Sequence, residues 1–352
     1  MLKDKGIGNR RIGRWTAFLG SVLPSSMAVL CALSLATSCH RRPLEDPSEL
    51  TRVKVIINTD SIKNVTSDIY NDKIERQTIE PEAMHALFFK KDNDDVVSET
   101  FITNITTEPD GRRALTGDVY LPKGEYRMLI YDYGTEETIV KDFYHYSEAL
   151  AYTDEAPYTV KSRFPTKTGE TVGILNEPDH LMVSSNDNEV IPYHKDVHTI
   201  ITEANTVVES WYIQIKVDGL KYVSSSQAVL SGLVSSNLIA SNTRINSPEA
   251  SVWFKLQKSD DNGVPVICAI FNTFGRIPES TNNLTVSFNI ITTDGRVVKC
   301  EYDISDLFLS ENAIKHQWLL LEDTIHIDPP PQKGGFEPSV EDWEEENREI
   351  YL

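Results

Sequence analysis

The alternation of apolar and polar residues limits the fold of this chain more than any other feature of its sequence. It is clearest in residues 53–58, 211–217 and 284–290. The apolar members, which would share one side of each segment, are Val53, Val55, Ile57, Trp211, Ile213, Ile215, Val217, Leu284, Val286, Phe288 and Ile290. Neighbouring side chains of a β-strand point to opposite faces, so this period of two predicts strands with one buried face.

Turn signals separate these segments at short intervals. Asp110-Gly111, Tyr133-Gly134 and Asp294-Gly295 are examples, and the last predicts a type-I′ hairpin that leads into Val297. Short strands joined by such turns favour antiparallel sandwiches over a parallel α/β sheet. We therefore predict an all-β protein with two β-sandwich domains in series, at residues 51–190 and 191–328. One short helix is predicted near residues 68–90, with an interruption at Pro81.

The first 38 residues have the three zones of a secretory signal. Residues 1–15 carry five bases against one acid, residues 16–38 carry no charge, and small residues up to Ser38 precede Cys39. A cysteine in this position resembles the lipobox of bacterial lipoproteins, which implies cleavage between Ser38 and Cys39 and a lipid, palmitate included, on Cys39. The competing interpretation is an uncleaved membrane anchor helix, because the apolar run is long enough to span a bilayer. Pro24 argues against that helix, and the helix does not explain the cysteine.

Charge defines how the rest of the chain can attach to a membrane. The full chain carries −19 and the first 38 residues carry +4, so the remaining 314 residues are near −23. Such a chain repels nucleic acid and is not drawn to anionic lipid headgroups. Attachment would then come from the lipid on Cys39, through a polar tether at residues 39–50.

The chain ends in an acidic segment, residues 329–352, that begins with three prolines and then two glycines. It carries seven acids within residues 336–352. Its composition is typical of a soluble disordered tail. The alternative is a partner-binding tail that docks through its large apolar residues, possible contacts being Phe336, Val340, Trp343 and Ile350.

Several short motifs occur in an order that resembles one known family. They are Cys39–Leu44, Leu121–Tyr126, Leu230-Ser231-Gly232, Phe271–Gly275 and Gly334-Gly335-Phe336 followed by Asp342-Trp343. Together they resemble a Bacteroides-type family of fimbrillin-like lipoproteins of unknown function, which is similar to the anchor and minor subunits of fimbriae. The resemblance implies two transthyretin-like β-sandwich domains on a lipid anchor in the outer membrane, at the cell surface. It also implies fimbrial subunit proteins as partners, bound by the addition of a strand to an open sheet edge.

Neither a catalytic site nor a cofactor is predicted. His194 and His198 have the spacing of a zinc protease, but Lys195 occupies the position of the general base, so no metal site is predicted. Cys268 and Cys300 lack metal-ligand spacing. Export would permit a disulfide between them, but the predicted strands do not place them opposite each other, so two buried free thiols are expected. The alternative function is glycan binding by a surface lipoprotein, through a platform of aromatic residues. The candidates are Tyr126, Tyr131, Trp211, Trp253 and Trp318.

Overall fold

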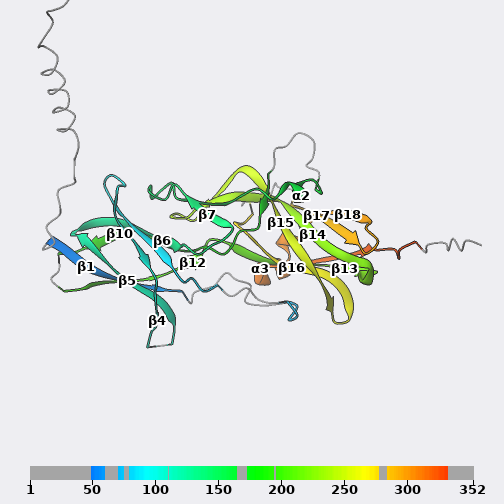
Figure 1. Cartoon of the computed structure of the whole chain (residues 1–352), viewed down its shortest axis with the longest axis horizontal. Helices are drawn as coiled ribbons and strands as arrows, with labels where there is room; N and C mark the ends of the chain where they lie inside the picture. The colour runs from blue at the N-terminus through cyan, green and yellow to red at the C-terminus, as the bar shows by residue number, and fades with distance from the viewer. Residues whose placement is uncertain are drawn as a thin grey trace, which may run out of the picture. The chain divides into compact units, whose positions relative to one another are not determined.

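The computed structural model describes residues 49–59, 70–74, 79–109, 111–164, 173–193, 196–276 and 284–331. These residues belong to one compact unit that begins at Glu49, and strands dominate it (Figure 1). The α-helices of the described ranges are short, namely α2 (Tyr158–Lys161) and α3 (Glu311–His316). The all-β class expected from the alternation is confirmed. No helix in the described ranges is long and apolar enough to cross a membrane.

Two sheets form the first part of the structure. One has the order β11-β1-β5-β4 and the other has the order β12-β10-β6-β2-β3. The strands of the first are β1 (Leu50–Asn58), β4 (Asn104–Thr107), β5 (Arg113–Pro122) and β11 (His198–Glu203). Those of the second are β2 (Met84–Lys90), β3 (Val96–Ile102), β6 (Gly124–Asp132), β10 (Met182–Ile191) and β12 (Asn205–Thr206).

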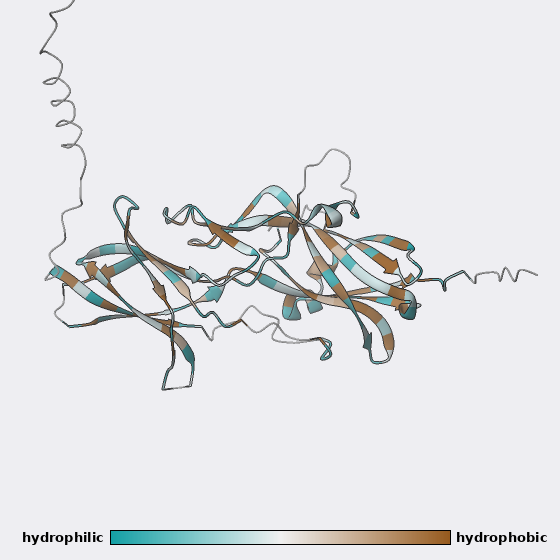
Figure 2. Cartoon of the chain, viewed as in Figure 1, coloured by the Kyte–Doolittle hydropathy of each residue, from teal (hydrophilic) through white to brown (hydrophobic). Residues whose placement is uncertain are grey.

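The first hydrophobic core lies between these two sheets. The alternating residues Val53, Val55 and Ile57 of β1 face it, together with Phe88 of β2 and Met128 of β6. Hydrophobic and hydrophilic residues alternate along the strands, as the period of two predicts (Figure 2).

The helix predicted near residues 68–90 is wrong where the structure describes it, because residues 84–90 form strand β2. All six residues from Met84 to Phe89 are buried. Ala86 and Phe88 belong to the first core, whereas Leu87 and Phe89 face a different core on the other side of the sheet. A strand that is buried on both faces has no polar alternation, so periodicity alone does not distinguish it from a buried helix.

A third sheet forms the second part of the structure, with the order β18-β17-β14-β15-β16-β13-β19 and with β7, β8 and β9 attached at its side. Its strands are β7 (Thr138–Lys141), β8 (Leu150–Thr153), β9 (Gly173–Asn176), β13 (Glu209–Asp218), β14 (Val223–Leu238), β15 (Thr243–Asp261), β16 (Val264–Thr273), β17 (Thr285–Thr292), β18 (Val297–Asp303) and β19 (Trp318–His326). Strand β15 pairs with β14 as far as Leu256 and with β16 from Gln257 onward, so it passes from one layer to the other. A second core lies between the layers and contains the predicted row Trp211, Ile213, Ile215 and Val217.

The pairing differs from the predicted purely antiparallel sandwiches in three places. Strands β1 and β11, β13 and β19, and β9 and β15 pair in parallel. In each case a long stretch of chain separates the two partners, so the later strand re-enters the sheet from the same end as the earlier one.

The hairpin between β17 and β18 also differs from its predicted turn. Gly295 has a positive φ of 86°, but Asp294 is not among the residues with positive φ, which a type-I′ turn requires at both central positions. The N–H of Gly295 donates to the carbonyl of Thr292 at 3.0 Å, and the N–H of Thr292 donates to the carbonyl of Arg296 at 2.9 Å. These bonds define a three-residue loop in which glycine occupies the left-handed position.

A third core connects the two parts. The outer face of the second sheet contributes Leu87, Leu129 and Val183, and these pack with Val234 and Phe274 of the second part. Strand pairing crosses the predicted domain division at residue 190/191 in both directions. Strands β7 to β9 precede the division but join the third sheet, whereas β11 and β12 follow it but join the first two. The division into domains 51–190 and 191–328 stays a prediction.

Gly219 offers a test of the close backbone contact with Ile327, which follows the end of β19. Its φ is +82°, and a Cβ added there would collide with the carbonyl oxygen of Ile327. We expect Gly219→Ala to lose about 1–2 kcal/mol from the left-handed backbone and a further ~1–3 kcal/mol from the collision. Gly263→Ala is the matched control, because Gly263 has a φ of +87° but nothing within 4 Å of the added Cβ. Urea denaturation measures both, and equal losses would contradict the proposed collision.

Candidate functional site

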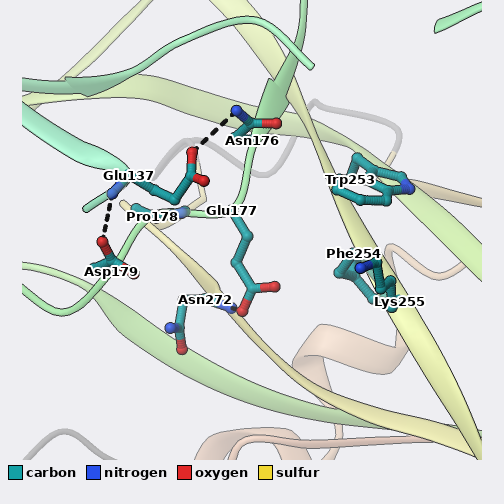
Figure 3. Close-up of a pocket in the computed structure, with 9 residues that line it drawn as sticks. All are labelled: Glu137, Asn176, Glu177, Pro178, Asp179, Trp253, Phe254, Lys255 and Asn272. Atoms are coloured by element: carbon teal, nitrogen blue, oxygen red, sulfur yellow. Dashed lines mark hydrogen bonds between the residues drawn. The ribbon is translucent and has the colours of Figure 1, made fainter. Parts of the chain in front are cut away.

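A polar pocket of about 300 Å³ lies where the connection between β9 and β10 passes the third sheet (Figure 3). The connection supplies Glu177, Pro178 and Asp179, and the end of β9 supplies Asn176. The other lining residues are Glu137, Trp253, Phe254, Lys255 and Asn272. Three acids, two amides, one amine and one indole ring therefore surround a volume at the lower limit of a small-molecule site.

Hydrogen bonds from backbone and side-chain N–H groups fix the carboxyl groups of this pocket. The N–H groups of Glu136 and Glu137 donate to Asp179 at 2.7 and 2.5 Å. The side-chain amide of Asn176 donates to Glu137 at 3.0 Å. The backbone N–H of Asn272 donates to Glu177 at 2.9 Å. Burial nevertheless raises the pKa of Glu177 to about 8, although the hydrogen bond from Asn272 acts to lower it. This carboxyl is therefore protonated at neutral pH.

A chain of hydrogen bonds continues from Asn272 into the protein. Ser210 donates its hydroxyl proton to Oδ1 of Asn272 at 2.7 Å. Nε2 of His180 lies 2.7 Å from Oγ of Ser210, and Nδ1 lies 2.9 Å from Oγ1 of Thr206. Burial lowers the pKa of His180 to about 4, so the ring is neutral. Because Ser210 donates its proton to Asn272, we infer that Nε2 carries the ring proton and donates it to Ser210. Nδ1 then accepts the proton of Thr206, in place of the 3.2 Å bond from this hydroxyl to the carbonyl of Val208.

This arrangement places a serine beside a histidine but does not assemble a nucleophile. A catalytic histidine accepts the proton of its serine, whereas here the inferred proton runs from His180 to Ser210. Both side chains are also buried. The bonds instead connect β12, β13 and β16 with the connection that lines the pocket, and they satisfy polar groups that the packing buries.

Metal and thiol chemistry find little support in the described ranges. They contain no group of three or more His, Cys, Asp or Glu side chains that could hold a metal ion. His194 lies outside the described residues, and His198 lies 3.9 Å from Glu189. Cys268 and Cys300 are free thiols on β16 and β18, and burial raises the pKa of both. A raised pKa disfavours the reactive thiolate at neutral pH.

The five aromatic residues considered for a glycan platform do not meet in one place. Tyr126, Tyr131 and Trp211 are buried in three different cores. Trp318 stacks on His316 with ring centroids 4.3 Å apart, and Trp253 lines the polar pocket. Strand periodicity placed these residues on buried faces or on separate sheets, so the predicted platform is wrong as a single site.

A different group of aromatic rings does gather on the surface, and we call it the aromatic patch. It consists of Phe101, Tyr133 and Tyr144, together with the rings beneath them, His85 and Phe143. Phe101, Tyr133 and Tyr144 are each more than half exposed. Phe101 stacks on His85 with centroids 4.5 Å apart and planes 14° apart, and it meets Tyr133 edge-on at 4.8 Å. Phe143 contacts both His85 and Tyr144. Contiguous exposed rings of this kind mark interaction sites more often than isolated ones do.

His85 anchors the aromatic patch from below. Its Nδ1 lies 2.9 Å from the hydroxyl of Tyr131, and its Nε2 lies 3.4 Å from a carboxylate oxygen of Glu99 without forming a hydrogen bond. Burial lowers the pKa of His85 although Glu99 acts in the opposite direction. The ring is therefore uncharged at neutral pH and supports Phe101 by stacking. The sequence carried no sign of this patch, because its members come from β2, β3, the end of β6 and the segment after β7.

The aromatic patch adjoins an open sheet edge. Strand β3 is the last strand of its sheet and pairs only with β2 among the described strands. Its outer side therefore presents N–H and C=O groups that are not paired in the sheet, although its last residue, Ile102, packs against Gly117 of β5. Strands β4, β11, β12, β18 and β19 are the other ends of the sheet orders in the described ranges.

The remaining predicted site residues lie outside the described residues. These are Ser38 and Cys39 at the predicted cleavage site, and Phe336, Val340, Trp343 and Ile350 in the predicted partner-binding tail.

Comparison with known proteins places this chain in a family. Residues 54–255, more than half of the chain, match the family described as a domain of unknown function (DUF5119). The chain belongs to this family. The similarity to fimbrial anchor and minor subunits, inferred from the ordered motifs, is confirmed by the relatives described next.

One curated relative matches almost the whole chain. It is a Bacteroides ovatus protein provisionally named as a fimbrium anchoring subunit, Fim4B. The identity is 21% over an alignment of 358 positions, which covers 92% of this chain and 97% of the relative. A crystal structure from the same species, provisionally titled an adhesin, has 20% identity and a TM-score of 0.57, and the match covers 84% of this chain and 98% of that one. The fold is therefore the same over nearly the whole of that structure. The fimbrial anchor protein Mfa2 of Porphyromonas gingivalis is less similar, with 13% identity and a TM-score of 0.41 over 74% of this chain and 85% of Mfa2.

The protonated carboxyl of Glu177 makes stability depend on pH. The folded state holds this proton between about pH 4.5 and pH 8, while the unfolded state releases it, so the Glu177 contribution falls as pH rises through that window. Glu177→Gln keeps a neutral side chain at every pH. We expect it to match the natural protein near pH 4.5 and to exceed its stability by on the order of a few kcal/mol near pH 8.

Denaturation curves of both proteins across this range provide the measurement. His180 has the opposite dependence, because its lowered pKa removes stability as pH falls from about 6.5 to about 4. Its contribution is common to both proteins and cancels in their difference. A difference that does not change with pH would contradict the raised pKa of Glu177.

Proposed function

We propose that this protein is a lipid-anchored subunit at the cell surface that anchors or completes a fimbria by binding other fimbrial subunits. Its relatives over most of the chain are provisionally named as a fimbrium anchoring subunit and as an adhesin. Fimbrial relatives support a location at the cell surface or in the envelope. We also propose that Cys39 carries the lipid, that this lipid inserts in the outer membrane, and that the protein does not act as an enzyme.

The same proposal includes the domain organisation. We place two transthyretin-like β-sandwich domains at residues 51–190 and 191–328, with the acidic segment 329–352 after them. Support comes from the separate cores of the first two sheets and of the third sheet. The strand exchange across residue 190/191 would then couple the two domains.

The observation that carries the binding function is the open edge of β3 beside the aromatic patch. A partner strand that pairs with β3 gains backbone hydrogen bonds, which depend little on sequence. Phe101 and Glu99 project from β3 itself, and Tyr133 lies against Phe101, so side chains of the added strand would meet rings and a carboxylate. Rigid aromatic side chains give large contact area at a small entropic cost, which suits a specific interface.

Glycan binding is the second candidate function, and the polar pocket favours it. Trp253 offers an aromatic surface there, and Asn176, Glu177 and Lys255 offer donors and acceptors for hydroxyl groups. Titration of the folded protein with soluble polysaccharides, followed by tryptophan fluorescence, tests this function. A signal that persists in Trp253→Phe would contradict it.

Deletion of the gene tests the fimbrial role directly. We expect electron microscopy to show fimbriae that are fewer, altered in length or shed into the medium, because a base or accessory subunit is missing. Complementation with the natural gene should restore them. Unchanged number, length and attachment of fimbriae, with the neighbouring fimbrial genes expressed, would contradict the proposal.

Removal of two exposed rings of the aromatic patch tests the binding surface. We expect cells that carry Phe101→Ser with Tyr133→Ser to bear several-fold fewer attached fimbriae at an unchanged protein level. The matched control is Tyr158→Ser, because Tyr158 is 80% exposed and lies on α2, away from the patch. Equal fimbriation in all three strains would exclude the patch as the binding surface.

A further inference from the structure

The described chain enters the structure at one end of the first two sheets. Strand β1 begins at Leu50, which pairs with Pro122 at the end of β5. The hydroxyl of Thr51 donates to the carbonyl of Pro192 at 2.7 Å, just after the end of β10. The start of β1, the turn between β5 and β6 at 122–124 and the segment at 191–193 therefore share one end, which we call the entry end (Figure 1, where β1 is blue).

Exposed apolar side chains surround the entry end. Tyr120, Val190, Tyr193 and Val197 are 58%, 53%, 51% and 44% exposed, and we call these four residues the girdle. Tyr120 pairs with Arg52 on the first sheet, whereas Val190 pairs with Glu125 on the second. Each lies within two residues of a strand end or in the adjoining segment. The girdle thus occupies both layers and the tip, not one face.

The length of chain before the entry end limits its distance from any lipid on Cys39. Ten peptide units join Cys39 to Glu49, the first described residue. An extended chain advances at most about 3.3–3.6 Å per residue, so the entry end lies within roughly 35 Å of the lipid. The short tether therefore keeps this end of the fold near the bilayer.

We propose that the girdle rests in the headgroup layer of the membrane to which Cys39 is attached. The occupant is a lipid surface, and the inference rests on the lipid attachment in the proposed function. Tyrosine combines an apolar ring with a polar hydroxyl and is enriched at membrane interfaces for that reason. Contact by the girdle adds a second attachment to the lipid and orients the fold, which leaves β3 and the aromatic patch available for a partner.

The charges near the entry end determine what kind of contact this is. Lys91 and Lys123 lie there with Glu125, and Lys91 is already 3.3 Å from the Glu125 carboxylate. Arg52 pairs with Asp118 at 2.7 Å. Two of these three bases are therefore matched by acids, so at most a small net attraction to anionic lipids is expected. Contact should depend on the apolar girdle and should withstand an increase in salt concentration.

The test places a nitroxide label at Lys123→Cys in the lipidated full-length protein, with Cys300→Ser to remove the half-buried thiol. The protein is reconstituted in phosphatidylethanolamine–phosphatidylcholine vesicles. We expect the label to be accessible to lipid-soluble oxygen and several-fold less accessible to an aqueous nickel complex than a label at Leu309→Cys, a residue of the second part that is 56% exposed. Tyr120→Ser with Tyr193→Ser should make the Lys123→Cys label accessible to the nickel complex, whereas Tyr158→Ser should not.

The outcomes separate the inference from the function on which it rests. If mass spectrometry finds no lipid on Cys39 and the protein does not sediment with vesicles, the anchoring itself fails and the girdle's place in the bilayer fails with it. If the protein is lipidated and sediments but the Lys123→Cys label is as exposed to nickel as the Leu309→Cys label, only the role of the girdle is overturned. Release of the girdle from the bilayer at raised salt would also overturn that role, because the attraction would then be electrostatic.

Discussion

Burial of one sheet on both of its faces is the constraint on which the rest of this structure depends. The sheet of β2, β6 and β10 sends Phe88 and Met128 into the core that it shares with the first sheet, and it sends Leu87 and Leu129 into the core that it shares with the second part. Apolar burial on both sides is worth about 25 cal/mol per Å² of surface removed from water. The two parts are therefore joined by packed side chains and not only by the chain that runs between them.

The polar groups that are buried at this junction form hydrogen bonds with one another. His180 bridges Thr206 and Ser210, and Ser210 reaches Asn272, whose backbone N–H holds Glu177. Neutral protonation states of His180 and Glu177 avoid the cost of burying charge. The junction thus resembles a catalytic site in composition only, since the protons of His180 and Ser210 are used in hydrogen bonds that stabilise the fold. The surface features suited to binding lie elsewhere, at the edge of β3 and around the entry end.

These surfaces agree with a protein that acts between a membrane and an assembly. The chain enters the fold beside Tyr120 and Tyr193. Phe101 and Tyr133, in contrast, belong to the second sheet, whose outer face packs in the third core. A contact with lipid at one place and an open strand edge at another would let one subunit hold both a membrane and a partner. In the proposed complex, backbone pairing at the edge would provide the affinity, and the rings beside it would provide the specificity.

The sequence by itself determined the all-β class and the buried rows, since the alternation of Trp211, Ile213, Ile215 and Val217 fixes which face is apolar wherever only one face is buried. It also determined the family, through motifs spread over the chain. Only the tertiary structure decided that Met84–Phe89 is a strand, because burial on both faces erases the period. The aromatic patch likewise existed only after folding, since Phe101, Tyr133 and Tyr144 come from segments that no local rule connects. Local periodicity reports a residue's own environment, whereas a binding surface is defined by which distant segments the packing brings together.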